Sequence, residues 1–301
     1  MMNAHYTNSI WGGGQLLAFS GIDGETNYLH ALKLRTIFDG YGFEIMLDDP
    51  CCANPVVRYI AGVPDKIELT GDYFRFTKGD RVSSGAFVDC CNLLFEGDFE
   101  IKNVAGVDVL QHADRWLIAA KGFLNLMGPD RDIDAEIEKR AVFLDSLFDS
   151  GRIPDTQPLI KACSQLKTQI YSPEGQIKHF WSTPDRWPHK QMWLWDSVFH
   201  AIGMRHCNPK LARDLINSVF DLQQKDGFIP LCGNPYEQHH LTQPPILGLG
   251  IKLVMESEPD EVWLADLSPK LARYIEWLMK YRDSTGEGLL QWYVGMNKNC
   301  R

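Results

Sequence analysis

Hydrophobic and polar residues alternate in short runs over the first part of the chain, which predicts β-strands rather than helices. Residues 32–38 alternate, a turn signal follows at Asp39-Gly40, and residues 43–47 alternate again, so this segment should form a β-hairpin. Similar runs, separated by Gly-Asp, Lys-Gly and Glu-Gly signals, span residues 56–60, 66–76, 86–95, 99–101 and 115–120. Such a series of short strands predicts an antiparallel β-sandwich over residues 1–127.

From residue 128 onward the hydrophobic period becomes helical. Six helices are expected, paired as three hairpins, at residues 133–149, 158–170, 191–206, 209–224, 245–256 and 269–281. Asn208-Pro209 and Ser268-Pro269 each offer an N-cap side chain followed by a proline at the first helical position. The helix at 209–224 has a wide apolar face, so it should have neighbours on more than one side, as in stacked hairpins or a helical toroid. The predicted fold class is therefore mixed, with a β-sandwich followed by helical hairpins over residues 128–301.

Composition and charge exclude several function classes. The chain has 301 residues, a formal net charge of −9 and no run of Lys or Arg, which argues against a nucleic-acid or anionic-membrane surface and favours a small neutral ligand. The first residues lack the basic and apolar regions of a secretory signal, and no apolar run is long enough to span a membrane, so a cytoplasmic protein is expected.

The eight cysteines include two adjacent pairs, Cys51-Cys52 and Cys90-Cys91, but show no C-x-x-C spacing. Free thiols in a reducing compartment are therefore expected, with no bound metal and no cofactor.

The segment 181–197 carries the clearest candidate chemistry, because it sets one acid, Asp196, among four tryptophans. These are Trp181, Trp187, Trp193 and Trp195. Aromatic rings stack on the apolar faces of sugars, and a carboxyl group beside such rings loses hydration, which raises its pKa toward that of a general acid. Two alternatives remain open: Asp196 as the N-cap of the following helix, and tryptophans that only fill the core.

The positions of two tryptophans suggest different roles. Trp187 lies in a proline-containing loop and is the better stacking platform, whereas Trp195, next to the acid, would shape its pocket. Asp185-Arg186 is most simply a local salt bridge, with contact to ligand hydroxyls as the alternative.

A long loop between the fourth and fifth expected helices supplies further candidates. It contains Tyr236 and then Gln243, whose amide is held in place by the two prolines that follow it and would suit a sugar hydroxyl. His239-His240 in the same loop are weak metal candidates, because no Cys or carboxylate stands at a recognisable ligand spacing.

Four motifs, taken in this order, resemble the catalytic half of glycoside hydrolase family sixty-three. They are Thr-Pro-Asp-Arg-Trp-Pro at 183–188, Trp-Asp-Ser at 195–197, Asp-Gly-Phe-Ile-Pro at 226–230 and Gln-Pro-Pro at 243–245. That family includes processing alpha-glucosidases and bacterial mannosylglycerate hydrolases. The resemblance extends more loosely from about residue 132 to the end of the chain.

The resemblance implies an (α/α)6 toroid, of which residues 128–301 would supply the first half, and an inverting mechanism with Asp196 as general acid. It places Gln243 near the sugar and implies a glutamate base in a segment after Asp283. No match to that segment precedes Arg301, so the resemblance predicts that the chain is truncated. Glu237 and Glu287 are the only loop glutamates considered as substitutes for the base.

The leading hypothesis is an inverting glycosidase that cleaves an alpha-glucosidic or alpha-mannosidic bond in a small sugar or oligosaccharide. Its substrate-binding residues would be Trp181, Arg186, Trp187, Trp193, Trp195, Tyr236 and Gln243. A second hypothesis is a non-catalytic carbohydrate-binding remnant, and a third is a helical-repeat interaction protein whose tryptophans face a partner peptide.

Overall fold

The chain forms two compact units in a computed structural model that describes residues 11–48, 53–149 and 157–291. Unit 1 comprises Met1–Ser172 together with Asp185–Pro188, and unit 2 comprises Pro173–Pro184 together with His189–Arg301. The change from strands to helices near residue 128 therefore falls inside unit 1.

Five strands form the first sheet of unit 1, in the order β1-β2-β3-β4-β9 with antiparallel neighbours throughout. Their bounds are Leu16–Ala18 (β1), Lys33–Thr36 (β2), Gly42–Ile45 (β3), Val56–Tyr59 (β4) and Phe99–Lys102 (β9). The predicted hairpin is confirmed as β2 and β3, which pair with Leu34 opposite Ile45. Gly40 adopts a φ of 93° in the turn between them, a value that favours glycine.

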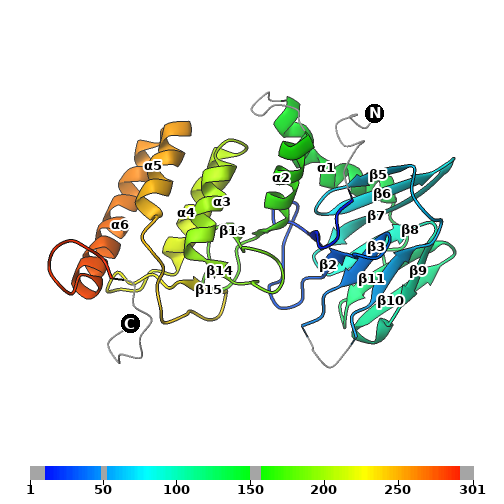
Figure 1. The fold of residues 1–301 in the computed structure, drawn as a ribbon, viewed down its shortest axis with the longest axis horizontal. Helices are drawn as coiled ribbons and strands as arrows, with labels where there is room; N and C mark the ends of the chain where they lie inside the picture. Colours follow the sequence, from blue (N-terminus) through cyan, green and yellow to red (C-terminus); the bar gives the residue numbers. More distant parts are fainter. Residues whose placement is uncertain (1–10, 49–52, 150–156, 292–301) are drawn as a thin grey trace. The chain divides into compact units, whose positions relative to one another are not determined.

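Six antiparallel strands form the second sheet, in the order β10-β11-β8-β7-β6-β5 (Figure 1). Their bounds are Lys66–Leu69 (β5), Tyr73–Lys78 (β6), Arg81–Asp89 (β7), Asn92–Glu96 (β8), Val107–His112 (β10) and Arg115–Ala120 (β11). The predicted runs overlap all strands in both sheets except β1 and β10. The runs at 66–76 and 86–95, each expected as a single strand, are wrong in extent, because each contains a turn and spans parts of two strands. A short 3-10 helix, η2 (Val104–Gly106), precedes β10.

One buried core joins the two sheets. It includes Leu34 and Phe43 from the first sheet and Phe74, Phe87 and Ile118 from the second. Because successive side chains of a strand point to opposite faces, the second sheet also has an apolar face directed away from this core.

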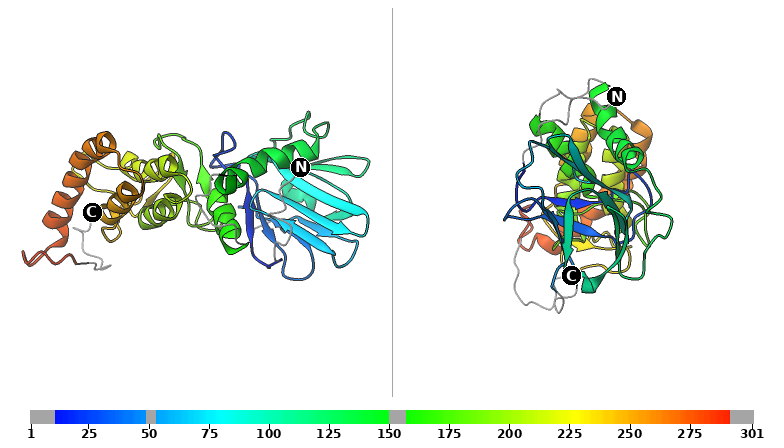
Figure 2. Two further views of the ribbon diagram at one scale, coloured as in Figure 1. Left: turned by 90° about the horizontal axis from the view of Figure 1, so that it is seen from above. Right: turned by 90° about the vertical axis from the view of Figure 1, so that its right-hand side faces the viewer.

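Helix α1 (Ile133–Asp149) covers that other face of the second sheet (Figure 2). Its apolar residues Ile133, Ile137 and Ala141 pack in one buried cluster with Tyr73 and Leu94. Helix α2 (Gln157–Thr168) and the short strand β12 (Ile170–Tyr171) complete unit 1. The first expected pair of helices therefore belongs with the sheets.

Unit 2 contains four helices, α3 (Leu194–Met204), α4 (Pro209–Asp221), α5 (Leu247–Ser257) and α6 (Glu261–Arg282), within the described residues. Short strands β13 (Trp181–Ser182), β14 (Met192–Trp193) and β15 (Cys232–Gly233) lie among the loops. Helix α4 packs against both α3 and α5, which explains its wide apolar face. The expected cap at Asn208 is confirmed, because its Oδ1 accepts a hydrogen bond from Leu211 N at 3.0 Å. The expected mixed class, antiparallel sheets followed by six helices, is confirmed within the described part of the chain.

The expected start of the last helix at Ser268-Pro269 is wrong. Helix α6 begins at Glu261, after Asp260, whose Oδ1 accepts a hydrogen bond from Trp263 N at 2.9 Å. Pro269 lies inside the helix on an exposed side, where its missing N–H leaves a carbonyl accessible to water. Burial of Trp263 and Leu267 before the proline favours the longer helix.

Two further expectations concern the chain as a whole. No helix in the described segments combines the length and hydropathy needed to cross a bilayer. The five cysteines with described positions are free thiols, as expected, namely Cys90, Cys91, Cys163, Cys207 and Cys232. The pair Cys51-Cys52 lies outside the described residues.

Candidate functional site

Asp196 is the third residue of α3 in unit 2. Pairing of β14 with β15 brings the chain to the start of this helix, and Leu194 N donates to Leu231 O at 2.9 Å. The N-cap residue is Trp193, so the alternative that Asp196 is the N-cap is wrong. Its partly buried carboxyl group lies in the first helical turn.

Gln243 holds the same turn from the long loop. Its Oε1 accepts a hydrogen bond from Trp195 N at 3.0 Å, and its backbone oxygen accepts one from Tyr274 Oη at 3.3 Å. Because the Trp193 side chain makes no capping bond, Gln243 satisfies an N–H of the first turn that would otherwise lack an acceptor. The structure thus brings Gln243 and the turn that carries Asp196 together.

Burial separates the tryptophans of unit 2 into different roles. Trp195 is 42% exposed and Phe199, one turn later, is 53% exposed, so the two rings share an open face of α3. Trp193 is partly buried, and its ring lies edge-on to His189 with centroids 6.1 Å apart. Trp181 is 0% exposed, so its indole has no open face for a sugar. Sequence reasoning missed Phe199, although its spacing of four residues from Trp195 was a usable signal.

His200 also lies close to the acid along α3, one turn after Asp196. Its Nδ1 is 2.9 Å from Ser182 Oγ, and burial lowers its pKa to about 4. The imidazole is therefore neutral at physiological pH and adds no positive charge to the face it shares with the carboxylate.

Tyr236 lies on an ordered part of the long loop. It is 58% exposed, and its hydroxyl donates to Glu174 Oε1 at 2.6 Å, which raises the pKa of the phenol. Asn234 Oδ1 accepts from Tyr236 N, and Gln176 Nε2 donates to Asn234 O. These bonds fix the loop and keep the tyrosine ring accessible.

Arg186 and Trp187 belong to unit 1, whereas the other six predicted site residues belong to unit 2. Arg186 is 0% exposed, and burial lowers its pKa. Its Nε donates to Thr168 O at 2.5 Å, and its Nη2 donates to Phe19 O and Ile170 O at 3.0 and 2.6 Å. These carbonyl contacts and complete burial give the guanidinium a structural role and argue against contact with ligand hydroxyls. Trp187 is partly buried, with the Arg35 guanidinium 5.7 Å from its ring centroid.

The remaining loop candidates show simple local contacts. Glu237 and Glu287, the two glutamates considered as a base, are both exposed. The rings of His239 and His240 stack with centroids 4.5 Å apart, and His239 Nδ1 accepts from Leu241 N. No third ligand among the described residues completes a metal site around these histidines.

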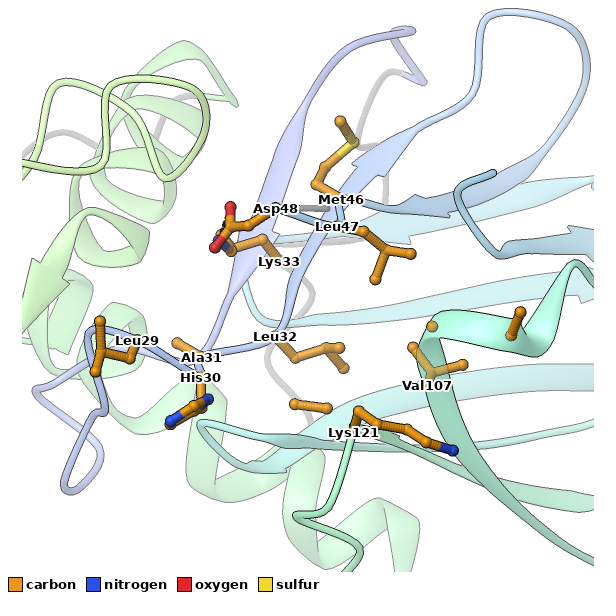
Figure 3. Close-up of a pocket in the computed structure, with 13 residues that line it drawn as sticks. Leu29, His30, Ala31, Leu32, Lys33, Met46, Leu47, Asp48, Val107 and Lys121 are labelled. Carbon is orange, nitrogen blue, oxygen red and sulfur yellow. Dashed lines mark hydrogen bonds and ion pairs between the residues drawn. The ribbon is translucent and has the colours of Figure 1, made fainter. Parts of the chain in front are cut away.

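A pocket of about 470 Å³ lies in unit 1, among the sheets (Figure 3). Hydrophobic side chains such as Leu32, Met46 and Leu47 line it, and the Lys33 ammonium at its edge pairs with Asp48 at 3.0 Å. None of the eight predicted site residues lines this pocket, so its size alone does not connect it with the chemistry of α3.

Comparison with known proteins gives a family similarity for part of unit 2. Residues 189–297 match the family model of the mannosylglycerate hydrolase MGH1-like glycoside hydrolase domain. This range runs from just before α3 to beyond α6 and includes Asp196 and Gln243. Residues 189–297 are therefore similar to glycoside hydrolase domains of the MGH1-like type, in line with the resemblance in the motifs.

Two curated relatives with a named activity also match part of the chain. The mannosylglycerate hydrolases MGH1 and MGH2 of Selaginella moellendorffii are each 22% identical over 146 residues. The alignment covers 40% of this chain and 30% of the length of each relative. The relationship is thus distant, and the chain matches about three tenths of the length of these relatives.

Proposed function

We propose that this chain belongs to an inverting alpha-glycosidase in which Asp196 is the general acid. The observation that carries the proposal is the placement of Asp196 in the first turn of α3, beside the open aromatic face of Trp195 and Phe199. Such a face stacks on a sugar ring, and a neighbouring carboxyl group then meets the glycosidic oxygen.

In the proposed reaction, Asp196 protonates the glycosidic oxygen as the bond to the leaving group breaks. A second carboxylate, roughly 6.5 to 9.5 Å from the first, would deprotonate the water that attacks the opposite face of the sugar. Among the described residues, Glu237 and Glu287 are the loop glutamates considered for that base. The helices of unit 2 would form part of an (α/α)6 toroid that surrounds the substrate.

The other contacts would hold the sugar. Trp195 and Trp193 would supply ring surface, and Tyr236 would supply an accessible ring on the ordered loop. The amide nitrogen of Gln243 would donate to a sugar hydroxyl, while its Oε1 accepts the hydrogen bond from the first turn of α3. The substrate class is an alpha-mannoside or alpha-glucoside of a small aglycone. The names of the two plant relatives favour mannosylglycerate.

The test uses the complete natural polypeptide that contains this sequence, with Asp196→Asn as the variant and Asp266→Asn as its matched control. Asp266 is exposed on α6, where its Oδ2 accepts from Lys270 Nζ at 2.8 Å. Loss of the general acid should lower kcat by about 10²- to 10⁴-fold on alpha-mannosylglycerate or on alpha-glucosides, whereas the control should keep its rate. Equal rates for Asp196→Asn and the unaltered enzyme would show that the acid is misassigned.

A second candidate function is sugar binding without hydrolysis, which the exposure of both Trp195 and Phe199 supports on its own. Calorimetry with mannose and glucose derivatives separates the two functions, because binding without release of product supports the second. Trp195→Ala should weaken this binding. If sugars change neither the heat signal nor the melting temperature, the third hypothesis, a helical-repeat interaction protein, gains support.

A further inference from the structure

The hairpin turn between β7 and β8 brings two adjacent thiols and a carboxylate together in unit 1. Cys90 and Cys91 occupy the turn, and their Sγ atoms are 3.6 Å apart. Asp89 ends β7, and its carboxylate and the two sulfur atoms all lie within 4.8 Å of one another. In the described part of the chain, this is the one group of three possible metal ligands at such distances.

The fold holds this turn from both sides. Cys90 O accepts a hydrogen bond from Leu32 N at 2.7 Å, and Cys91 O accepts one from Ala120 N at 2.9 Å. Strand β7 shows a register irregularity just before the turn, between Phe87 and Asp89, which changes the direction of the side chains that follow. The thiols are therefore positioned by neighbouring segments on both sides as well as by the turn itself.

The carboxylate of Asp89 is oriented by three donors. Its Oδ1 accepts from Cys91 N at 2.8 Å and from Asn92 Nδ2 at 2.9 Å, and its Oδ2 accepts from Asn125 Nδ2 at 3.4 Å. The bond from Cys91 N alone is an ordinary turn contact, which accounts for an acid at this position. This turn contact does not explain the two thiols beside the acid. Side-chain amides that orient a carboxylate, as those of Asn92 and Asn125 do here, are typical outer partners of metal ligands.

The distances suit a tetrahedral ion. With Zn–S bonds of about 2.3 Å, two sulfur ligands at the tetrahedral angle lie about 3.8 Å apart, close to the 3.6 Å between Cys90 and Cys91. Two thiolates and one carboxylate around a divalent cation leave one net negative charge. The buried guanidinium of Arg186 acts electrostatically on Cys90 and offsets that charge.

We propose that Asp89, Cys90 and Cys91 bind a thiophilic divalent cation of the zinc class, in a site separate from the helix that carries Asp196. Cys90 is partly exposed and gives the ion a route in, whereas Cys91 is buried. The sequence conceals the site, because the thiols are adjacent and lack the C-x-x-C spacing of familiar zinc sites.

The experiment uses the full chain, reduced and freed of metal. Zn²⁺ is titrated in competition with a chromogenic chelator, and Co²⁺ is added separately to detect thiolate-to-cobalt charge-transfer absorption. We expect one tightly bound ion per chain and a charge-transfer band in the unaltered protein. Cys90→Ser, at a partly exposed position, should weaken Zn²⁺ binding by at least about tenfold and remove most of the band.

The matched control is Cys51→Ser with Cys52→Ser, which removes the other adjacent pair and should leave Zn²⁺ affinity and the cobalt band unchanged. Asn125→Ala, which removes one outer contact to Asp89, should weaken binding by a smaller factor. The inference is overturned if the unaltered chain shows no charge-transfer band, or if the band survives Cys90→Ser and disappears in the control. The first of these results uses the unaltered chain and does not depend on how well any variant folds, whereas the assignment to Cys90 rests on the comparison of Cys90→Ser with the control.

Discussion

Removal of the Gln243 side-chain amide should loosen the first turn of α3 without changing any residue of that helix. Gln243 is buried, and its Oε1 is the acceptor for Trp195 N at 3.0 Å. The variant Gln243→Met keeps most of the side-chain volume and removes this acceptor. The Trp195 N–H is then left without its partner at a partly buried helix end.

The size of the effect follows from this single contact. Loss of a capping hydrogen bond costs about 1 to 2 kcal/mol, and the bond here is neutral and of ordinary length. A change of one to two kcal/mol corresponds to about a 5- to 30-fold change in an opening equilibrium. We therefore expect amide hydrogen exchange at Trp195 to accelerate by about that factor in Gln243→Met.

Two further variants separate capping from ligand contact. Gln243→Glu keeps an oxygen acceptor, and the positive end of α3 offsets burial of its charge, so protection of Trp195 should be retained. Because the variant loses the amide donor, it should still raise KM if that donor binds the sugar. Gln238→Met is the matched control, because Gln238 is exposed and its side chain bonds to the side chains of Gln176 and Gln224.

The assay is residue-resolved hydrogen exchange, by NMR or by mass spectrometry of peptides that cover the start of α3. Unchanged exchange at Trp195 in Gln243→Met would refute the capping role. Equal acceleration in Gln238→Met would show that the effect comes from general loosening of the loop.

Three other outcomes follow from buried or paired groups. Burial lowers the pKa of His200 from 6.5 to about 4, so the unfolded chain takes up a proton first as pH falls, and the free energy of unfolding should drop between these values by up to about 3 kcal/mol. The unfolding free energies of the unaltered chain and of His200→Asn, measured with denaturant, should therefore converge at low pH. A constant difference between them would contradict this. The hydrogen bond to Asp221 raises the pKa of His179, so the stabilisation from this pair is present below pH 6.5 and is lost as pH rises through the raised pKa. His179→Asn should therefore destabilise the chain more at pH 6 than at pH 9, and the reverse order would disprove the pairing. Arg186→Met leaves the buried carbonyls of Thr168 and Phe19 without the Arg186 donor, while Ile170 O keeps its bond from Gly21 N. The variant should cost at least about 2 kcal/mol in unfolding free energy, whereas Arg58→Met, at an exposed bond to one carbonyl, should cost well under half of that.

Local periodicity was sufficient to predict most elements of the fold. The alternation around Asp39-Gly40 gives the β2–β3 hairpin, because a two-residue period and a turn signal are both determined by neighbouring residues. The start of α6 was missed because two capping signals compete. Ser268-Pro269 looks like a helix start, yet Asp260 caps the helix eight residues earlier, and burial of Trp263 and Leu267 decides between them.

In the candidate site, too, local sequence signals predict only part of the arrangement. Asp196 and its aromatic neighbour Trp195 are adjacent in the sequence, so a motif reveals them. Gln243 was predicted as a sugar ligand, and its second contact, to Trp195 N, joins residues 48 positions apart. Arg186 was predicted from the same kind of motif, but only the fold shows that backbone carbonyls surround it. Contacts that depend on chain reversal over tens of residues have no local sequence signal.

The position of Arg186 bears on how this protein can be divided or recombined. Residues 185–188 belong to unit 1 although the residues on either side of them in the sequence belong to unit 2. A gene fragment that starts after residue 172 would carry Arg186 away from Thr168, Phe19 and Ile170, and a fragment that ends there would leave those carbonyls without it. Exchange of the helical part between homologues should therefore preserve the loop that contains Arg186 together with the sheets it came with.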